Sequence, residues 1–419
     1  MENILKSRWF SPAFLLVMAV SVVIVYSGTF SAGFHFDDIP LIVENNALRD
    51  LNNFFDLLTG QRGVTMATFV LNYAVGGLDV TGYHIVNTAI HIINAGLAYL
   101  LLTATLAKSG FTTERSRKIA AVAALFFALH PIQTQSVTYI VQRMESLSAL
   151  FYLAALLAFV KAAGLNAKSG RIALYGSVVV FYILGFYSKE VAVTLPAVIF
   201  LYDLFFVSSM RLKGLASRWP LYLALVVLLV YFIVSTVVPA GGFGDLSEEL
   251  ARSSAPISAG FGVAGISVYE YLLTEFNVII YYIALLFVPV NQNLDYDFPI
   301  SSGLFQTPVV RDGAVLNIPI TMPVVSLVII LIIIGGGVWL LLRSRVASAG
   351  TDKGAGGRAR VAAFFIFWFF ILLSPTSSFI PILDVIFEHR LYLASLGFFT
   401  LVALFIDRVF AGRGEGLSG

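Results

Sequence analysis

The sequence predicts an all-α polytopic membrane protein with ten or twelve transmembrane helices. Of its 419 residues, 58% are hydrophobic and only 12% are charged, and the mean hydropathy is +0.89, far from the values of soluble domains. Several apolar runs reach the length of about 20 residues that crosses about 30 Å of hydrocarbon. Nothing in the composition indicates a nucleic-acid partner. Because the chain has no cysteine, disulfides, thiolate nucleophiles and cysteine metal sites are excluded.

The first apolar run follows Lys6 and Arg8 but is longer than the core of a signal peptide and has no clear cleavage site. We therefore expect it to be kept as the first helix. Ten crossings are expected near residues 10–30, 84–107, 119–130, 146–160, 172–187, 191–207, 219–238, 323–342, 361–373 and 391–406. The region 258–290 allows two short crossings, a re-entrant hairpin or a helix lying in the interface.

Basic residues define the expected orientation because they gather in alternate loops. They are Lys6, Arg8, Lys108, Arg115, Arg117, Lys118, Lys161, Lys168, Arg171, Arg211, Lys213, Arg218, Arg343, Arg345, Lys353, Arg358, Arg360, Arg408 and Arg413. The positive-inside rule places these loops and both termini in the cytoplasm. Residues 240–322 must then begin and end outside, so the region 258–290 adds zero or two crossings.

We expect one membrane domain over residues 1–410 and a short cytoplasmic tail over 411–419. A first outer loop covers residues 31–83, and a long outer segment covers 240–322. The glycine-rich and charged stretch 347–360 is typical of a flexible linker and would lie on the inner face.

The outer loops hold most of the unusual polar residues. They include Asp37, Asp38, His130, Arg143, Glu145, Lys189, Glu190, Asp295, Asp297, Glu388, His389 and Arg390. Ionisable groups at membrane depth are costly, so their gathering on one face indicates a functional site. For any single residue the alternative is an interfacial side chain or a surface ion pair. His130, which precedes Pro131, could simply end its helix.

A second group of polar residues lies inside a predicted span. His84 and His91 are seven residues apart and share one helix face with Asn87 and Asn94. We expect these four side chains to pack in a polar seam between helices rather than to bind a metal.

Acids and cations together on the outer face favour a transferase that uses a lipid-phosphate donor. The donor phosphate needs lysine or arginine where negative charge develops, and the acceptor hydroxyl needs a base. A transporter usually has its polar groups near the midplane of the bilayer, and a channel needs rings of like groups. Two alternatives are kept: a flippase or transporter subunit for lipid-linked sugars, and a structural assembly factor. Both predict tolerance of changes at Asp37 and Asp38.

Six blocks of sequence carry a resemblance to a known family. They are "FDDIPLIVENNALRD", "GYHIVNTAIHIINAGLAYLLL", "HPIQTQSVTYIVQRMESLSALFYLAALLAF", "YSKEVAVTLPAVIFLYDLFF", "VNQNLDYD" and "EHRLYLASLGFF". In this order, from about residue 34 to residue 400, they resemble the membrane domain of the transmembrane and tetratricopeptide-repeat O-mannosyltransferases and their bacterial relatives, which belong to the GT-C superfamily of glycosyltransferases. The resemblance implies a GT-C fold with helices in its outer loops.

The resemblance also implies an activity: inverting transfer of mannose or another hexose from a polyprenyl-phosphate donor to a hydroxyl, usually of serine or threonine in a protein that has crossed the membrane. It assigns the catalytic acid in the first outer loop to Asp37 or Asp38. We favour Asp37 as the base, and the sequence leaves the choice between them open.

The other roles follow by position and charge within this resemblance. Lys189 and Arg390 are expected to bind the donor phosphate, with Arg143 as a third candidate. Residues expected to orient these cations or to line the sugar and acceptor pocket are Glu190, Glu145, His130, Glu388, His389, Asp295 and Tyr296. The segments 240–257 and 291–322 could close over the site as a lid.

We expect no cofactor and no metal, because lysine and arginine can neutralise the phosphate, although a divalent ion on loop carboxylates is an open alternative. The chain ends at Gly419 without tetratricopeptide repeats, a departure from the family pattern that puts a protein acceptor in doubt. A separate acceptor-presenting partner, a glycolipid or an envelope glycan are the alternatives. The expected location is a bacterial inner membrane with the active site on the periplasmic face.

Overall fold

The computed structural model describes residues 5–237, 263, 265–311, 316–349 and 353–414, and these residues contain helices and loops but no β-strand. Nine of the described helices are long and apolar enough to cross a membrane. A tenth candidate is the pair Thr113–Leu129 and Pro131–Thr138, which is bent by 52°. The chain is therefore an all-α polytopic integral membrane protein, as the composition predicts.

The ten expected crossings each contain helical residues. The long helices are α2 (Phe10–Tyr26), α5 (Val80–Lys108), α6 (Thr113–Leu129), α8 (Arg143–Ala162), α9 (Lys168–Phe186), α12 (Trp219–Val237), α15 (Pro323–Ala349), α16 (Lys353–Leu373) and α17 (Leu391–Gly414). The crossing near 191–207 is made of three consecutive helical pieces, of which the middle one is α10 (Leu195–Tyr202).

The region 258–290 contains the described helix α14 (Val268–Phe287), which has the length and composition of a crossing. Its start is fixed by a capping box, in which Ser267 and Glu270 satisfy each other's backbone N–H groups. Residues 258–262 and 264, which belong to the same region, lie outside the described residues. The alternatives of zero or two crossings therefore stay predictions.

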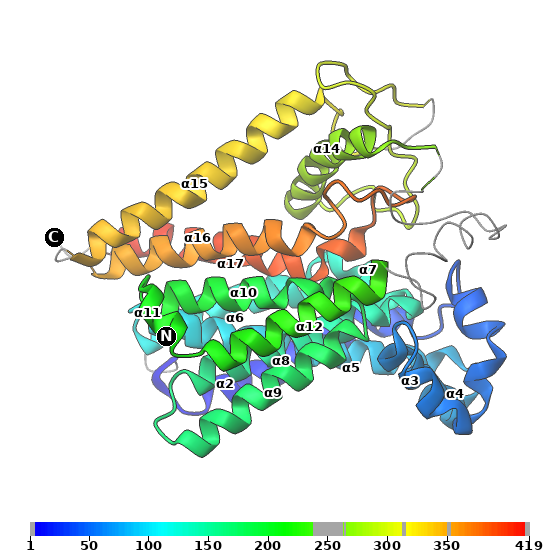
Figure 1. Cartoon of the computed structure of the whole chain (residues 1–419), viewed down its shortest axis with the longest axis horizontal. Helices are drawn as coiled ribbons and strands as arrows, with labels where there is room; N and C mark the ends of the chain where they lie inside the picture. The colour runs from blue at the N-terminus through cyan, green and yellow to red at the C-terminus, as the bar shows by residue number, and fades with distance from the viewer. Residues whose placement is uncertain (1–4, 238–262, 264, 312–315, 350–352, 415–419) are drawn as a thin grey trace.

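Most of the long helices lie side by side along the long axis of the molecule, whereas α15 runs obliquely away from them (Figure 1). The N-terminal and C-terminal ends of the described chain lie at the same end of this bundle. The short helices α3 (Phe54–Leu58), α4 (Gly63–Gly76) and α7 (Thr134–Thr138) lie at the opposite end, together with α14. We call this second end the loop end.

The polar seam expected along α5 is confirmed. His91 is fully buried, and its two ring nitrogens hydrogen-bond to the Tyr392 hydroxyl (2.7 Å) and the Ala128 carbonyl oxygen (3.0 Å). The amide of Asn94 donates to the Ser146 carbonyl oxygen at 2.7 Å. These bonds satisfy polar groups inside the bundle and fix α5 against its neighbours.

The first outer loop is folded into short helices. The helix α4 follows Arg62, whose φ of 54° is in the left-handed region. The next residue must be small, because a Cβ on Gly63 would lie 2.3 Å from the Leu58 carbonyl oxygen. The N-terminus of α4 docks on the loop after α9, where the backbone N–H of Val64 donates to the Tyr187 carbonyl oxygen (3.1 Å) and the Thr65 hydroxyl donates to that of Ser188 (3.2 Å).

Candidate functional site

The two neighbouring aspartates of the first outer loop lie in opposite environments. Asp38 is 1% exposed, and its carboxylate accepts the backbone N–H groups of Val141 (2.7 Å) and His35 (3.1 Å). Asp37 is exposed. Its backbone N–H donates to the Tyr139 hydroxyl at 2.8 Å, which fixes the main chain. Asp38 therefore ties the loop to the segment before α8 and leaves the Asp37 carboxylate free to meet a ligand.

The burial of Asp38 changes its acidity. Desolvation raises the pKa of its carboxyl group to about 6, against the opposing effect of the two N–H donors and of His35. A local turn makes this arrangement possible, since Phe36 adopts a left-handed φ of 44° between the two hydrogen-bonded residues. Such a backbone conformation is uncommon for a bulky residue.

Three exposed carboxylates from different loops lie in one electrostatic neighbourhood. Burial and the negative charges of Asp295 and Asp37 raise the pKa of Asp384, while the positive charge of Arg390 opposes the rise. Asp295 and Asp37 are expected site residues and are both exposed. Sequence reasoning missed Asp384, which lies in the loop between α16 and α17. The structure thus brings the first loop, the segment after α14 and the loop before α17 to one place.

Arg390 connects this acidic group to the interior. Its guanidinium donates to the backbone carbonyl oxygens of Asp384 (2.6 Å) and Val385 (2.9 Å), and the residue is 8% exposed. On its buried side lies Glu275 of α14, a second residue that the sequence did not reveal. Glu275 is 1% exposed, interacts electrostatically with Arg390, and has the hydroxyl groups of Tyr271 and Ser377 beside its carboxylate.

Lys189 is held by two polar partners from the start of α8. Its ammonium group lies 2.6 Å from a carboxylate oxygen of Glu145 and donates to the Gln142 side-chain oxygen at 3.2 Å. Its side chain is 13% exposed and that of Glu145 is 3% exposed. The expectation that Glu145 orients a cation agrees with this pairing.

Glu190, which follows Lys189 in the chain, forms an ion pair with a residue that the sequence did not reveal. Both of its carboxylate oxygens accept hydrogen bonds from Arg62, with Nε–Oε1 and Nη2–Oε2 distances of 3.0 and 3.1 Å. The docking of α4 on the loop after α9 brings these residues together across 128 positions of sequence. The side chain of Arg62 is 35% exposed, more than that of Lys189.

The three cations share a common neighbour. The electrostatic interactions of the His389 ring include those of Lys189, Arg390 and Arg62. The backbone N–H of His389 and its Nδ1 both lie within hydrogen-bond distance of the Gln135 side-chain oxygen, at 2.6 and 3.0 Å. His389 is therefore fixed near three cations of the loop end, two of which are paired with acids; we call Arg62, Lys189 and Arg390 the cation cluster.

Glu388 anchors the segment after α14. One carboxylate oxygen accepts the Tyr296 hydroxyl and the backbone N–H of Asn293 (2.9 Å), and the other accepts the side chain of Gln292 at 2.5 Å. Glu388 is thus bound to residues 292–296 and not to a member of the cation cluster. The possible lid 291–322 starts on this anchored segment, whereas the other lid segment, 240–257, lies outside the described residues.

The side chains of Arg143 and His130 form hydrogen bonds within the protein. Each guanidinium nitrogen of Arg143 donates within the protein: Nε to Asn87 (2.6 Å), Nη2 to the Tyr83 carbonyl (3.1 Å) and Nη1 to Thr68 (3.2 Å). Arg143 is fully buried, and all three of its guanidinium nitrogens already donate within the protein; its contact with the donor phosphate stays a prediction. His130 accepts the backbone N–H of Ile132 at 3.2 Å and caps the turn that follows α6, which is the simpler of its two interpretations.

Among the described residues, no group of three histidine, aspartate or glutamate side chains is arranged to hold a metal ion. That no metal is needed stays a prediction. It is based on the ability of lysine and arginine to neutralise the donor phosphate.

The fold and this site define a class: an integral membrane protein whose bundle carries acids and cations from several loops at one end. Similarity to curated proteins shows which members of this class the chain resembles. The chain is 29% identical over 226 residues to the protein O-mannosyl-transferase Tmtc3 of Drosophila melanogaster, covering 47% of this chain and 24% of that protein. It is 34% identical over 165 residues to TMTC3 of Mus musculus (36% and 17%) and 29% identical over 195 residues to TMTC4 of Homo sapiens (41% and 26%).

These similarities confirm the resemblance drawn from the six sequence blocks. The aligned part of the chain spans only about a quarter or less of the length of these relatives. No protein-family model matches the sequence, and no solved structure matches the chain. The relatives therefore establish what the chain is similar to, and its own activity is a proposal.

Proposed function

We propose that this protein is a glycosyltransferase that moves a sugar from a polyprenyl-phosphate donor to a hydroxyl group at the loop end of its bundle. One observation supports the proposal: Asp384 is affected both by the negative charge of the exposed Asp37, whose backbone N–H is bound to Tyr139, and by the positive charge of the buried Arg390. A base for an acceptor and positive charge for a departing phosphate are the two requirements of this reaction.

The proposed step is a single displacement with inversion. The acceptor oxygen forms a bond to the anomeric carbon of the sugar, and the bond from this carbon to the phosphate oxygen breaks. The phosphate leaves with the electron pair, and the proton of the acceptor hydroxyl goes to the carboxylate of Asp37. Asp38 takes no proton from the acceptor in this scheme, because its two oxygens bind backbone N–H groups.

The cation cluster is suited to the leaving phosphate. Arg390 uses two of its five N–H groups on backbone carbonyl oxygens, and Lys189 uses two of its three on Glu145 and Gln142. These carbonyl and side-chain partners leave further N–H groups on both residues. Glu145 and Glu190 keep Lys189 and Arg62 in place before the donor binds, which reduces the reorganisation needed during reaction.

The substrates are proposed from the relatives, which are named as protein O-mannosyl-transferases. Mannose is accordingly the first sugar to test, and a serine or threonine hydroxyl of a translocated protein is the first acceptor. A glycolipid, an envelope glycan, or a protein presented by a separate partner are the other acceptors to test. The acidic side chains Asp295 and Asp384 are placed to contact the sugar or the acceptor, because both lie near Arg390.

The proposed location is a bacterial inner membrane, with the loop end on the periplasmic side. The distribution of basic residues supports this orientation, because the ends of α15 and α17 that carry Arg343, Arg345 and Arg408 lie at the end opposite to the site.

The experiment is a transfer assay on the purified full-length protein with radiolabelled mannose carried either by a short-chain polyprenyl phosphate or by a nucleotide. Acceptors are a pool of serine and threonine peptides and, separately, envelope oligosaccharides. We expect labelled peptide only from the lipid donor. NMR of the product should show that the anomeric configuration is inverted relative to the donor. Transfer from the nucleotide alone, or retained configuration, would contradict the mechanism. Saturable donor binding without transfer to any acceptor would favour the carrier alternative.

A further inference from the structure

A second polar feature lies at the opposite end of the bundle from the proposed site. A pocket of about 340 Å³ is formed between α15, α16 and α17, close to the ends of the described chain. Each helix contributes one arginine to it: Arg343 from α15, Arg358 from α16 and Arg408 from α17. The proposed transferase reaction uses none of these residues.

Within the described part of the chain, the positive charge of this pocket is only partly neutralised. Asp407 lies 2.8 Å from Arg358 and also 2.8 Å from Arg115, so one carboxylate is shared by two guanidinium groups. The positive charges of Arg115 and Arg408 both act on Arg358. Neither Arg343 nor Arg408 forms an ion pair with a described residue, and both are exposed. Like charges on three packed helices repel each other unless an anion lies between them.

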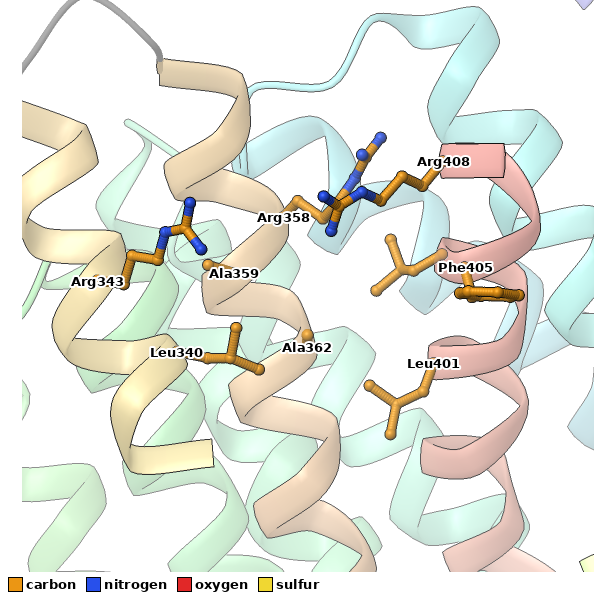
Figure 2. A pocket seen from close by; sticks show the side chains of 9 residues that line it. Leu340, Arg343, Arg358, Ala359, Ala362, Leu401, Phe405 and Arg408 are labelled. Atoms are coloured by element: carbon orange, nitrogen blue, oxygen red, sulfur yellow. The ribbon is translucent and has the colours of Figure 1, made fainter. Parts of the chain in front are cut away.

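The wall below the arginines is apolar. Leu340 and Phe405 line the pocket just under one turn, and Leu401 about two turns, along their helices from the arginines. Figure 2 shows the three arginine side chains near the helix ends and the leucines deeper along the helices. The pocket thus has a charged rim and an apolar wall, and Phe405 is 67% exposed, so the wall is open to the surroundings of the bundle.

We propose that this pocket binds the headgroup phosphate of an anionic glycerophospholipid, with an acyl chain lying along the apolar wall. A free phosphate would use the arginines and leave the wall without a role, whereas a lipid matches both parts. Basic pockets between transmembrane helices on the cytoplasmic side are typical sites for anionic headgroups. The bound phosphate bridges α15 to α16 and α17, and so it stabilises the oblique helix against the rest of the bundle.

The proposal is tested on the purified full-length protein by native mass spectrometry and thermal unfolding, with phosphatidylglycerol and phosphatidylcholine of identical acyl chains. We expect phosphatidylglycerol to bind more tightly and to raise the unfolding temperature. The double variant Arg343→Gln/Arg408→Gln should bind it at least about tenfold more weakly, since each arginine near an anionic headgroup contributes about fivefold. The matched control is Arg345→Gln, which removes an exposed arginine of α15 that does not line the pocket.

The outcomes separate the possible sources of the phosphate. Equal binding of the two lipids by the wild-type protein overturns the proposal even if the double variant does not fold. An equal loss of binding in the control variant shows attraction by surface charge alone and also overturns it. Displacement of the lipid by millimolar inorganic phosphate identifies a free-anion site in place of a lipid site. Selective, phosphate-resistant binding that is lost only in the double variant supports it.

Discussion

Asp37 and Asp38 are chemically identical and adjacent, yet the structure buries the carboxylate of Asp38 and exposes that of Asp37. Their side chains diverge at a turn with a left-handed Phe36, so one carboxylate enters the protein and the other stays outside. The sequence predicted that only one of them would meet a hydroxyl, because adjacent side chains point apart. It could not say which, since the answer depends on backbone donors from Val141, more than 100 positions away.

The raised pKa of Asp38 makes a prediction about pH and stability. The folded protein holds a proton on Asp38 up to its raised pKa of about 6, whereas the unfolded chain releases it near the ordinary aspartate pKa of 3.8. The stabilisation from this proton is complete below pH 4 and is lost as the pH rises through 6. The unfolding temperature of the wild type, relative to Asp38→Asn, should therefore fall between pH 4 and pH 7, by the equivalent of about 3 kcal/mol at most.

The pH prediction is measured by thermal unfolding of both proteins in the same detergent at each pH. Subtracting the two curves cancels the other titrating groups. Parallel curves for wild type and variant would show that Asp38 keeps its ordinary pKa and is more solvated than its burial indicates.

Arg62 provides a test of the cation cluster that does not involve the base. Replacing it in Arg62→Gln removes a partly exposed positive charge and leaves Glu190 without its partner. We expect the KM for the lipid donor to rise about tenfold, equivalent to about 1.4 kcal/mol, with a smaller change in kcat. Steady-state kinetics of Arg49→Gln, an exposed arginine of the same loop, supply the control. If both variants keep the wild-type KM, Arg62 does not contribute to donor binding.

Sequence reasoning missed Arg62, Glu275 and Asp384. Arg62 and Glu275 reach the site through contacts between segments far apart in sequence. Asp384 lies only six residues before Arg390, but no spacing or motif marks it as a site residue. The charge and loop position of Arg143 predicted a phosphate ligand. In the structure its hydrogen bonds join α8 to α5 and α4, and the role at the phosphate stays a prediction. One of its hydrogen-bond partners is Asn87. The predicted polar seam on α5 was therefore the sequence feature that could have indicated this contact.

At the scale of elements, apolar length predicted most of the helices because a membrane span is a local property of the chain. The bend of 52° between α6 and the following turn has a local cause too, in Pro131. The helices of the first outer loop were less accessible to prediction. The helix α4 is apolar but only 14 residues long, and its place depends on contacts with the loop after α9.

The segment 292–296 gives a prediction at this scale. Its attachment to Glu388 depends on the hydroxyl of Tyr296, which donates to the carboxylate and accepts the N–H of Asn293 at 3.2 Å. In Tyr296→Phe this attachment is weakened, because a hydrogen bond to a charged group contributes about 1.5–3 kcal/mol. Amide hydrogen exchange across the segment should accelerate about tenfold or more, while that of the spanning helices is unchanged.

The control for this measurement is Tyr269→Phe, since Tyr269 lies on α14 and is 55% exposed. Unchanged exchange in Tyr296→Phe would show that Gln292 and the Asn293 backbone hold the segment without the tyrosine. The segment would then be a poor candidate for a lid.

At the scale of the whole molecule, the two ends of the bundle differ in charge. At the loop end Lys189 and Arg62 are each paired with an acid, whereas at the other end Arg115 and Arg358 share the single carboxylate of Asp407. The orientation was predicted from this asymmetry, and the fold agrees in placing both ends of the described chain on the basic side. The number of crossings could not be predicted to the same degree, because α14 and residues 238–262 carry the ambiguity.

The orientation can be tested directly because the chain has no cysteine of its own. A cysteine in Asp56→Cys, in the first outer loop, should react with a membrane-impermeant thiol reagent in cells whose inner membrane is intact. A cysteine in Lys168→Cys, at the start of α9, should react only after that membrane is opened. The opposite pattern would invert the topology and place the site in the cytoplasm.

The central claim is that Asp37 is the base of a sugar transfer. Its most direct test is single-turnover transfer of mannose from a short-chain polyprenyl phosphate, compared between wild type, Asp37→Asn and Asp56→Asn, which alters another exposed acid of the same loop. We predict that Asp37→Asn binds the donor normally but transfers at least about 100-fold more slowly, while Asp56→Asn transfers at the wild-type rate. Equal rates in Asp37→Asn and the wild type would contradict the account.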